Sequence, residues 1–145
     1  MKGFARVVLP ALLLATPPHA FAASTVVVSE AWIRALPGGL PAGGYFTLHN
    51  GTAKTLTLSG AASPACGMLM LHRSETMGGM ASMSDVATID VPAGGTVRFS
   101  PGGLHLMCMQ PTNAIKRGAT IDVTLEFAGG TKLKSPFAVR GANGR

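Results

Sequence analysis

The chain has few aromatic and few acidic residues. Aromatic side chains make up 6% of its 145 residues, with one Trp and one Tyr, and only six residues are Asp or Glu. A nucleic-acid reader is expected to concentrate basic residues in a patch interleaved with aromatics, whereas the basic residues here are scattered. The formal net charge of +6 therefore indicates mild attraction to acidic surfaces, such as a partner protein or lipid headgroups, and no nucleic-acid partner.

The patterns of nucleophilic and redox catalysis are also missing. No Ser-His-Asp or Cys-His arrangement stands out, and the two cysteines do not form the C-x-x-C of a thiol oxidoreductase. Four of the acidic residues lie in or beside alternating stretches, which is typical of solvated strand faces: Asp85, Asp90, Asp122 and Glu126. The sequence therefore predicts a protein that is not an enzyme.

Long apolar runs are scarce as well. A positively charged start precedes an apolar run over 7–15, and Ala20-Phe21-Ala22 follows as a small-x-small cleavage pattern. The run is much shorter than the roughly 20 residues that a transmembrane helix needs, and no second long run follows. We therefore expect a signal peptide over 1–22, cleaved near Ala22, and an exported, soluble domain over 23–145 in the periplasm.

The remainder of the chain consists of short strand-like stretches separated by turn residues. No stretch shows a convincing 3.6-residue period, and Asn50-Gly51 is a strong tight-turn signal leading into the next stretch. About nine strands at short spacing predict one all-β domain, an antiparallel sandwich or barrel. The expected strands cover 25–33, 44–49, 55–59, 68–72, 86–91, 96–99, 104–109, 120–127 and 131–137.

Four residues, His72, Met83, His105 and Met107, form a candidate metal-ligand set. Thioether sulfur is a soft ligand that suits Cu(I), and neutral imidazole also suits copper. Because side chains two apart on a strand share a face, His105 and Met107 project together. A hairpin or loose loop over 73–82 would bring His72 and Met83 near each other. Together, the four predict a Cu(I) site rather than a zinc, magnesium or calcium site.

The spacing of these residues, H-x10-M-x21-H-x-M, resembles that of the periplasmic copper chaperones of the PCu(A)C type. Further stretches carry the resemblance: Ala31-Trp32-Ile33-Arg34-Ala35, Gly43-Gly44-Tyr45-Phe46-Thr47-Leu48, Val91-Pro92-Ala93-Gly94-Gly95 and Pro101-Gly102-Gly103-Leu104-His105-Leu106-Met107. The resemblance implies a cupredoxin-like Greek-key fold and a Cu(I) site near the surface. It also implies delivery of copper to the CuA centre of cytochrome c oxidase, through the subunit that carries CuA or through its assembly factors. We expect a monomer, because nothing indicates a dedicated interface.

Met77 and Met80 lie among glycines in a predicted exposed loop. They would form either an auxiliary copper entry or transfer site, or a hydrophobic cap over the primary site. A second copper ion there would favour periplasmic copper buffering or resistance over delivery to the oxidase. A blue-copper site is disfavoured, because it needs a Cys thiolate with two His and no His follows Cys108.

The two cysteines, Cys66 and Cys108, are an even count for an oxidising compartment, which permits a disulfide. Such a bond would tie the first ligand strand to the second and stiffen the site. The alternative is two small buried residues that never meet, and the sequence leaves both open.

Overall fold

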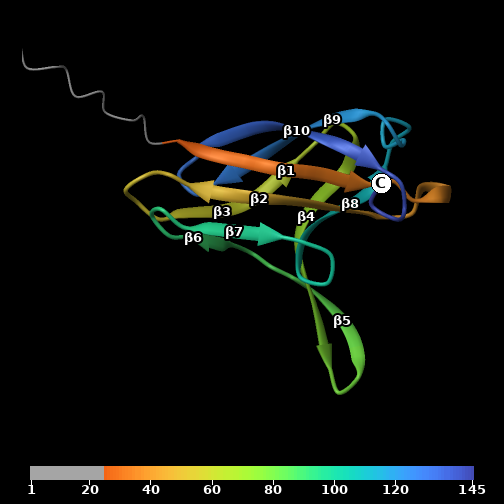
Figure 1. Cartoon of the computed structure of the whole chain (residues 1–145), viewed down its shortest axis with the longest axis horizontal. Helices are drawn as coiled ribbons and strands as arrows, with labels where there is room; N and C mark the ends of the chain where they lie inside the picture. The colour runs from red at the N-terminus through yellow and green to blue at the C-terminus, as the bar shows by residue number, and fades with distance from the viewer. Residues whose placement is uncertain (1–24) are drawn as a thin grey trace, which may run out of the picture.

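The structure, a computed structural model, describes residues 25–145 as strands connected by turns and one short 3-10 helix (Figure 1). The elements are β1 (Val26–Arg34), η1 (Pro37–Gly39), β2 (Ala42–Asn50), β3 (Leu56–Ala62), β4 (Cys66–Met77), β5 (Met80–Asp85), β6 (Ile89–Val91), β7 (Thr96–Phe99), β8 (Leu104–Pro111), β9 (Thr120–Phe127) and β10 (Lys132–Arg140). The predicted signal peptide over 1–22 lies outside the described residues. Within 25–145, no helix is long and apolar enough to span a bilayer.

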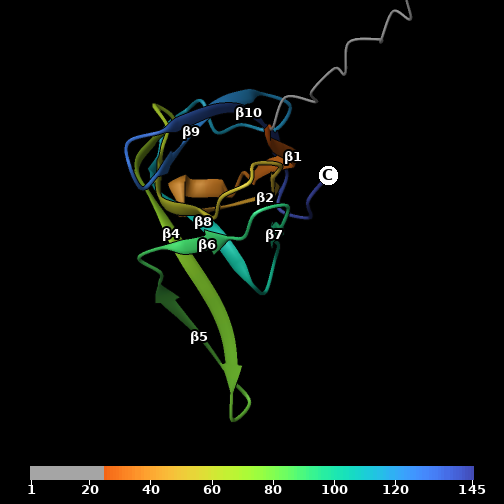
Figure 2. The same ribbon diagram turned by 90° about the vertical axis from the view of Figure 1, so that its left-hand side faces the viewer.

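The strands form one mixed sheet that wraps around a core (Figure 2). Its order is β5-β4-β8-β2-β1-β10-β9-β3-β6, and β7 pairs with β2. The prediction of an all-β fold is confirmed, but the prediction of a purely antiparallel one is wrong at a single pair, because β1 and β10 run parallel. A parallel pair needs a long connection, and here the whole domain lies between its first and last strands.

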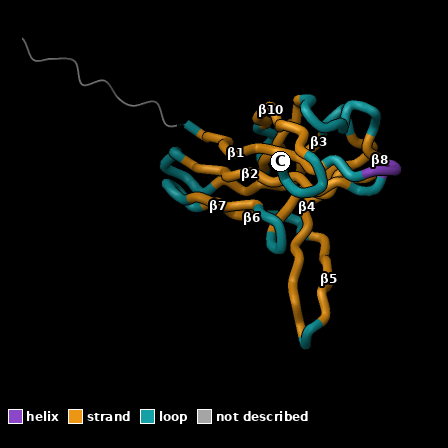
Figure 3. The backbone as a smooth tube through the Cα atoms, turned by 45° about the vertical axis from the view of Figure 1, so that its right-hand side comes forward, coloured by secondary structure: helices purple, strands orange, loops and turns teal. Residues whose placement is uncertain are grey.

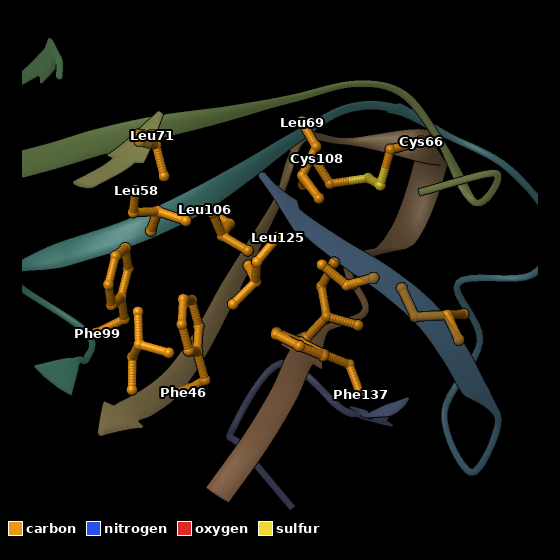
Figure 4. Close-up of a cluster of buried hydrophobic side chains, with 14 of the residues drawn as sticks. Phe46, Leu58, Cys66, Leu69, Leu71, Phe99, Leu106, Cys108, Leu125 and Phe137 are labelled. Atoms are coloured by element: carbon orange, nitrogen blue, oxygen red, sulfur yellow. A yellow bond between two sulfur atoms is a disulfide. The ribbon is translucent and has the colours of Figure 1, made fainter. Parts of the chain in front are cut away.

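The core is built from the inward-facing residues of the strands, along which buried and exposed positions alternate (Figure 4). Phe46 on β2 stacks on Phe99 of β7 with ring centroids 4.2 Å apart, and it meets Phe137 of β10 at 5.6 Å. All three rings are buried. Along β9, every second residue is buried: Ile121, Val123, Leu125 and Phe127. The two-residue period of the sequence therefore locates the core side of these strands.

The turn predicted at Asn50-Gly51 does not form a hairpin. The strands on either side of it, β2 and β3, do not pair with each other, so the chain crosses here to another part of the sheet. Asn50 is fully buried, and its side-chain amide donates hydrogen bonds to the carbonyls of Lys54, Val91 and Pro92 at 2.7, 2.9 and 3.2 Å. A satisfied buried amide thus holds the crossing in place.

Of the two alternatives expected over 73–82, a hairpin or a loose loop, the structure has the β-hairpin. Strand β4 continues through Met77, and β5 returns from Met80 after a two-residue turn in which Gly78 and Gly79 have φ of 59° and 79°. Positive φ at both positions suits glycine and matches the twist of a tight hairpin. The hairpin projects away from the body of the domain (Figure 3). All of β5 is exposed, so its sequence lacks the apolar alternation that would have revealed a strand.

Candidate metal centre

The outward face of the β4–β8 pair carries only methionine and histidine over three successive rungs. The register opposes His72 to His105, Met70 to Met107 and Met68 to Met109. Directly opposed residues on an antiparallel pair share a face, with Cβ atoms about 5 Å apart. The positions between them point inward and are buried: Leu69, Leu71, Leu106 and Cys108. The expectation that His105 and Met107 project together, away from Cys108, is confirmed.

Met83 reaches the same face from the neighbouring strand. It lies opposite Ser74, two residues beyond His72 on β4. A cavity of about 280 Å³ is lined by Met83, His105 and Met107 together with Tyr45, Ser74 and Arg34, among others; we call it the ligand cavity. The ring of His72 lies 5.7 Å from the ring of His105, centroid to centroid. The structure therefore places three of the four predicted ligands, Met83, His105 and Met107, around one cavity, and it places His72 beside His105 but outside the cavity lining.

The imidazole of His105 is held in one orientation by the backbone. It is 4% exposed, and its Nδ1 lies 3.0 Å from the carbonyl oxygen of Gly103. Because a carbonyl only accepts hydrogen bonds, Nδ1 carries the proton and Nε2 keeps a free lone pair in the neutral ring. An imidazole anchored through one nitrogen is oriented to coordinate a metal through the other.

The imidazole of His72 is half-buried and lies against a carboxylate. Its side chain is 13% exposed, and neither ring nitrogen has a hydrogen-bond partner among the described residues. Its Nε2 lies 2.9 Å from Oδ1 of Asp85, the residue opposite it on β5, without hydrogen-bond alignment. Buried polar atoms are normally satisfied, so Nδ1, which has no partner among the described residues, is the nitrogen left for a ligand. The sequence places Asp85 on a solvated face and gives no signal that it lies beside His72, because that contact depends on the hairpin register.

Met77 and Met80 lie opposite each other at the tip of the hairpin. Their side chains are 71% and 76% exposed. Met83 shares a face with Ser74, the residue opposite it on β4. Met77 lies three residues after Ser74 on the same strand, and residues an odd number of positions apart point to opposite faces. The tip pair therefore points to the face opposite to that of Met83. The pair does not line the ligand cavity, and the auxiliary site and the hydrophobic cap both stay predictions.

A disulfide joins the two strands that carry the candidate ligands. Cys66, at the start of β4, is bonded to Cys108 of β8, with Cα atoms 5.4 Å apart (Figure 4). Both cysteines belong to the buried cluster beneath the outward face of β4–β8 that carries the methionines and histidines, which we call the ligand face. The alternative that the two residues never meet is therefore wrong for this structure.

An aromatic and cationic group lies beside the ligand cavity and was missed by the sequence analysis. Trp32 and Tyr45 pack with ring centroids 4.7 Å apart, and the guanidinium of Arg34 lies 5.7 and 5.5 Å from the two rings. These are cation–π distances. Tyr45 also lies 6.4 Å from the ring of His105. The contacts hold a positive charge at the edge of the cavity, and only the pairing of β1 with β2 reveals them.

The fold defines an all-β domain of the PCuAC type, as comparison with solved structures shows. The copper-bound PCuAC domain from PmoF2 matches with a TM-score of 0.67 and 21% identity, over 83% of this chain and 97% of that one. The solution structure of CuI-DR1885 from Deinococcus radiodurans matches with a TM-score of 0.66 and 32% identity, over 82% of this chain and 81% of that one. The expected cupredoxin-like fold is confirmed.

Sequence comparison gives the family. Residues 26–139 match the LpqE-like family of putative lipoproteins, and the chain belongs to this family. A relative, the putative lipoprotein Lxx21020 of Leifsonia xyli subsp. xyli (strain CTCB07), is 36% identical over 118 residues, which cover 81% of this chain and 69% of the relative.

Proposed function

We propose that this protein is a copper chaperone that binds Cu(I) through His72, Met83, His105 and Met107. The observation that carries the proposal is the ligand cavity, which Met83, His105 and Met107 line, with His72 opposite His105. The similarity of the chain to the copper-bound PCuAC domain from PmoF2 and to CuI-DR1885 supports the choice of metal. The copper is delivered for assembly of the CuA centre of cytochrome c oxidase, to the subunit that carries CuA or to its assembly factors.

The donor set favours the monovalent ion. Two thioethers and two neutral imidazoles bring no negative charge, and thioethers are poor ligands for hard cations. Arg34 lines the same cavity, and its fixed positive charge repels a divalent ion about twice as strongly as a monovalent one at equal distance. The soft donors select Cu(I) against Cu(II) and Zn(II), whereas the charges of Arg34 and of Asp85, which lies 2.9 Å from Nε2 of His72, act in opposite directions.

The position of Met83 suits release to a partner. It lies on β5, an edge strand of the sheet, in a wholly exposed part of the hairpin. The imidazole of His105 is buried. A partner ligand therefore approaches from the side of Met83 and displaces this thioether first, while the histidines still hold the ion.

The protein works in the periplasm after export and cleavage near Ala22. The Cys66–Cys108 disulfide supports this location, because disulfides persist in oxidising compartments. The description of the family as lipoprotein-like also supports export. The protein acts as a monomer and needs no nucleic acid.

An anaerobic Cu(I) titration against a competing chelator tests the primary site. We expect the domain over 23–145 to bind one equivalent tightly, and the His105→Ala/Met107→Ala variant to lose it. His49→Ala is the matched control, because His49 lies on β2, hydrogen-bonds Thr96 at 2.9 Å and does not line the ligand cavity. Unchanged binding in the double variant would refute the four-ligand site.

Copper buffering without delivery is the second candidate, and the exposed tip pair Met77 and Met80 favours it. Delivery predicts that copper moves from the loaded protein to an apo CuA domain, measured as metal content after the two are separated. It also predicts that loss of the gene lowers oxidase activity under copper limitation. If copper stays on the protein and loss of the gene only increases copper sensitivity, buffering is correct.

A further inference from the structure

We propose a second Cu(I) site on the outer face of β4–β8, formed by the thioether stripe Met68, Met70 and Met109. The stripe begins on the same rung as a primary ligand, because Met70 lies opposite Met107. The site itself does not depend on the proposed function. Its role, feeding or receiving copper through Met107, does rest on it.

The register brings the three sulfur atoms within reach of one ion. Met68 and Met109 are directly opposed, and Met70 is diagonal to Met109. Cβ atoms are about 5 Å apart for opposed residues and about 7 Å apart for diagonal ones. The unbranched methionine side chain has three rotatable bonds, so the three thioethers can converge above the strands. Three neutral soft donors form a site for Cu(I) and for no hard cation.

Packing does not explain the residue at the most exposed position of the stripe, Met68, whereas Met70 and Met109 are half-buried. The inward positions of the same strands, which fill the core, include three leucines: Leu69, Leu71 and Leu106. The outward positions carry methionine, although Met68 is 57% exposed and an exposed position gains little from a flexible apolar side chain. Four of the eight methionines of the chain lie on these two rungs. This concentration of thioethers on one face supports a soft-metal site.

The stripe also has a direct route to the primary site. Met107 belongs to the ligand cavity and stands opposite Met70. Rungs two residues apart on a strand are separated by roughly 7 Å. An ion held by the stripe therefore exchanges one thioether for Met107 and then binds the imidazoles, with no change of oxidation state.

The test is a titration of the domain over 23–145, carrying 13C-methyl methionine, with Cu(I) under anaerobic conditions and NMR detection. We expect the first equivalent to shift the methyl signals of Met83 and Met107. The second equivalent is expected to shift the signals of the stripe. Met68→Leu/Met70→Leu/Met109→Leu is expected to lose the second equivalent and keep the first, whereas Met77→Leu/Met80→Leu keeps both.

Further arms keep the site testable if the triple variant does not fold or the primary site is wrong. Met68→Leu alone changes an exposed residue and is expected to weaken the second equivalent without unfolding the domain. In His105→Ala/Met107→Ala, the stripe is still expected to bind Cu(I), so failure of the primary site is seen separately. The proposal is overturned if the second equivalent shifts only Met77 and Met80, or if the stripe signals never move. The latter result would leave the stripe as an apolar surface for a protein partner.

Discussion

Replacing Cys66 and Cys108 together by alanine is expected to lower the free energy of unfolding by about 4 kcal/mol. The bond closes a chain segment with a sequence separation of 42 residues, and the chain-entropy treatment of a loop of this size gives about that value. Alanine is chosen over serine because serine would place an unpaired hydroxyl in the core. If the free energy of unfolding falls by about 2 kcal/mol per molar urea, the urea concentration at the midpoint of unfolding falls by about 2 M.

Urea unfolding followed by far-UV circular dichroism measures this loss. Reduction of the wild-type protein is expected to reproduce it, and the same reductant leaves the double variant unchanged, which controls for effects of the reagent. A loss below about 1 kcal/mol in both the variant and the reduced wild type would refute the reasoning that the bond acts by restricting the unfolded chain.

Three further outcomes are expected. Phe46→Ala removes a buried ring that contacts two other phenylalanines and lowers the free energy of unfolding by about 3–5 kcal/mol in the same assay; a loss under 1 kcal/mol contradicts the packing described. Asn50→Ala leaves buried carbonyls without donors and costs about 2–3 kcal/mol; an unchanged urea midpoint contradicts it. Asp85→Asn removes the negative charge that lies 2.9 Å from Nε2 of His72 and weakens Cu(I) binding about tenfold in the chelator competition, because the carboxylate attracts the cation; equal or tighter binding contradicts it.

The parts of the fold that follow a two-residue period could be predicted from the sequence. The expected bounds of the strands at 96–99 and 120–127 agree with β7 and β9, because buried Val, Ile, Leu and Phe alternate there with exposed residues. The same alternation puts His105 and Met107 on one face. These are local properties of a strand with one buried side, so the sequence contains them.

The register of the hairpin and the neighbours of each strand could not be predicted, and the sequence left a hairpin and a loose loop open over 73–82. Residues 80–85 are exposed on both faces, so no burial pattern marks β5 as a strand. The contact of His72 with Asp85 and the approach of Met83 depend on the register of that hairpin. Likewise, the pairing of β4 with β8 joins segments more than 30 residues apart, which a local pattern does not encode. The sequence therefore predicts the candidate ligands, but it does not contain the strand pairing that brings them together.

The core determines the geometry of the ligand face. A shift of one residue in the register of a strand pair moves every side chain to the opposite face. If β8 shifted in this way against β4, Leu106 and Cys108 would leave the core, and His105 would enter it. The Cys66–Cys108 bond and the buried leucines oppose such a shift. The ligand pairs therefore stay opposed because the inward residues are apolar and cross-linked. The buried leucines still oppose the shift when the bond is removed, so we expect the cysteine double variant, once folded, to keep the register of β4 and β8 and to bind Cu(I) with unchanged affinity in the chelator competition; weaker binding would show that the bond itself holds the ligand pairs opposed.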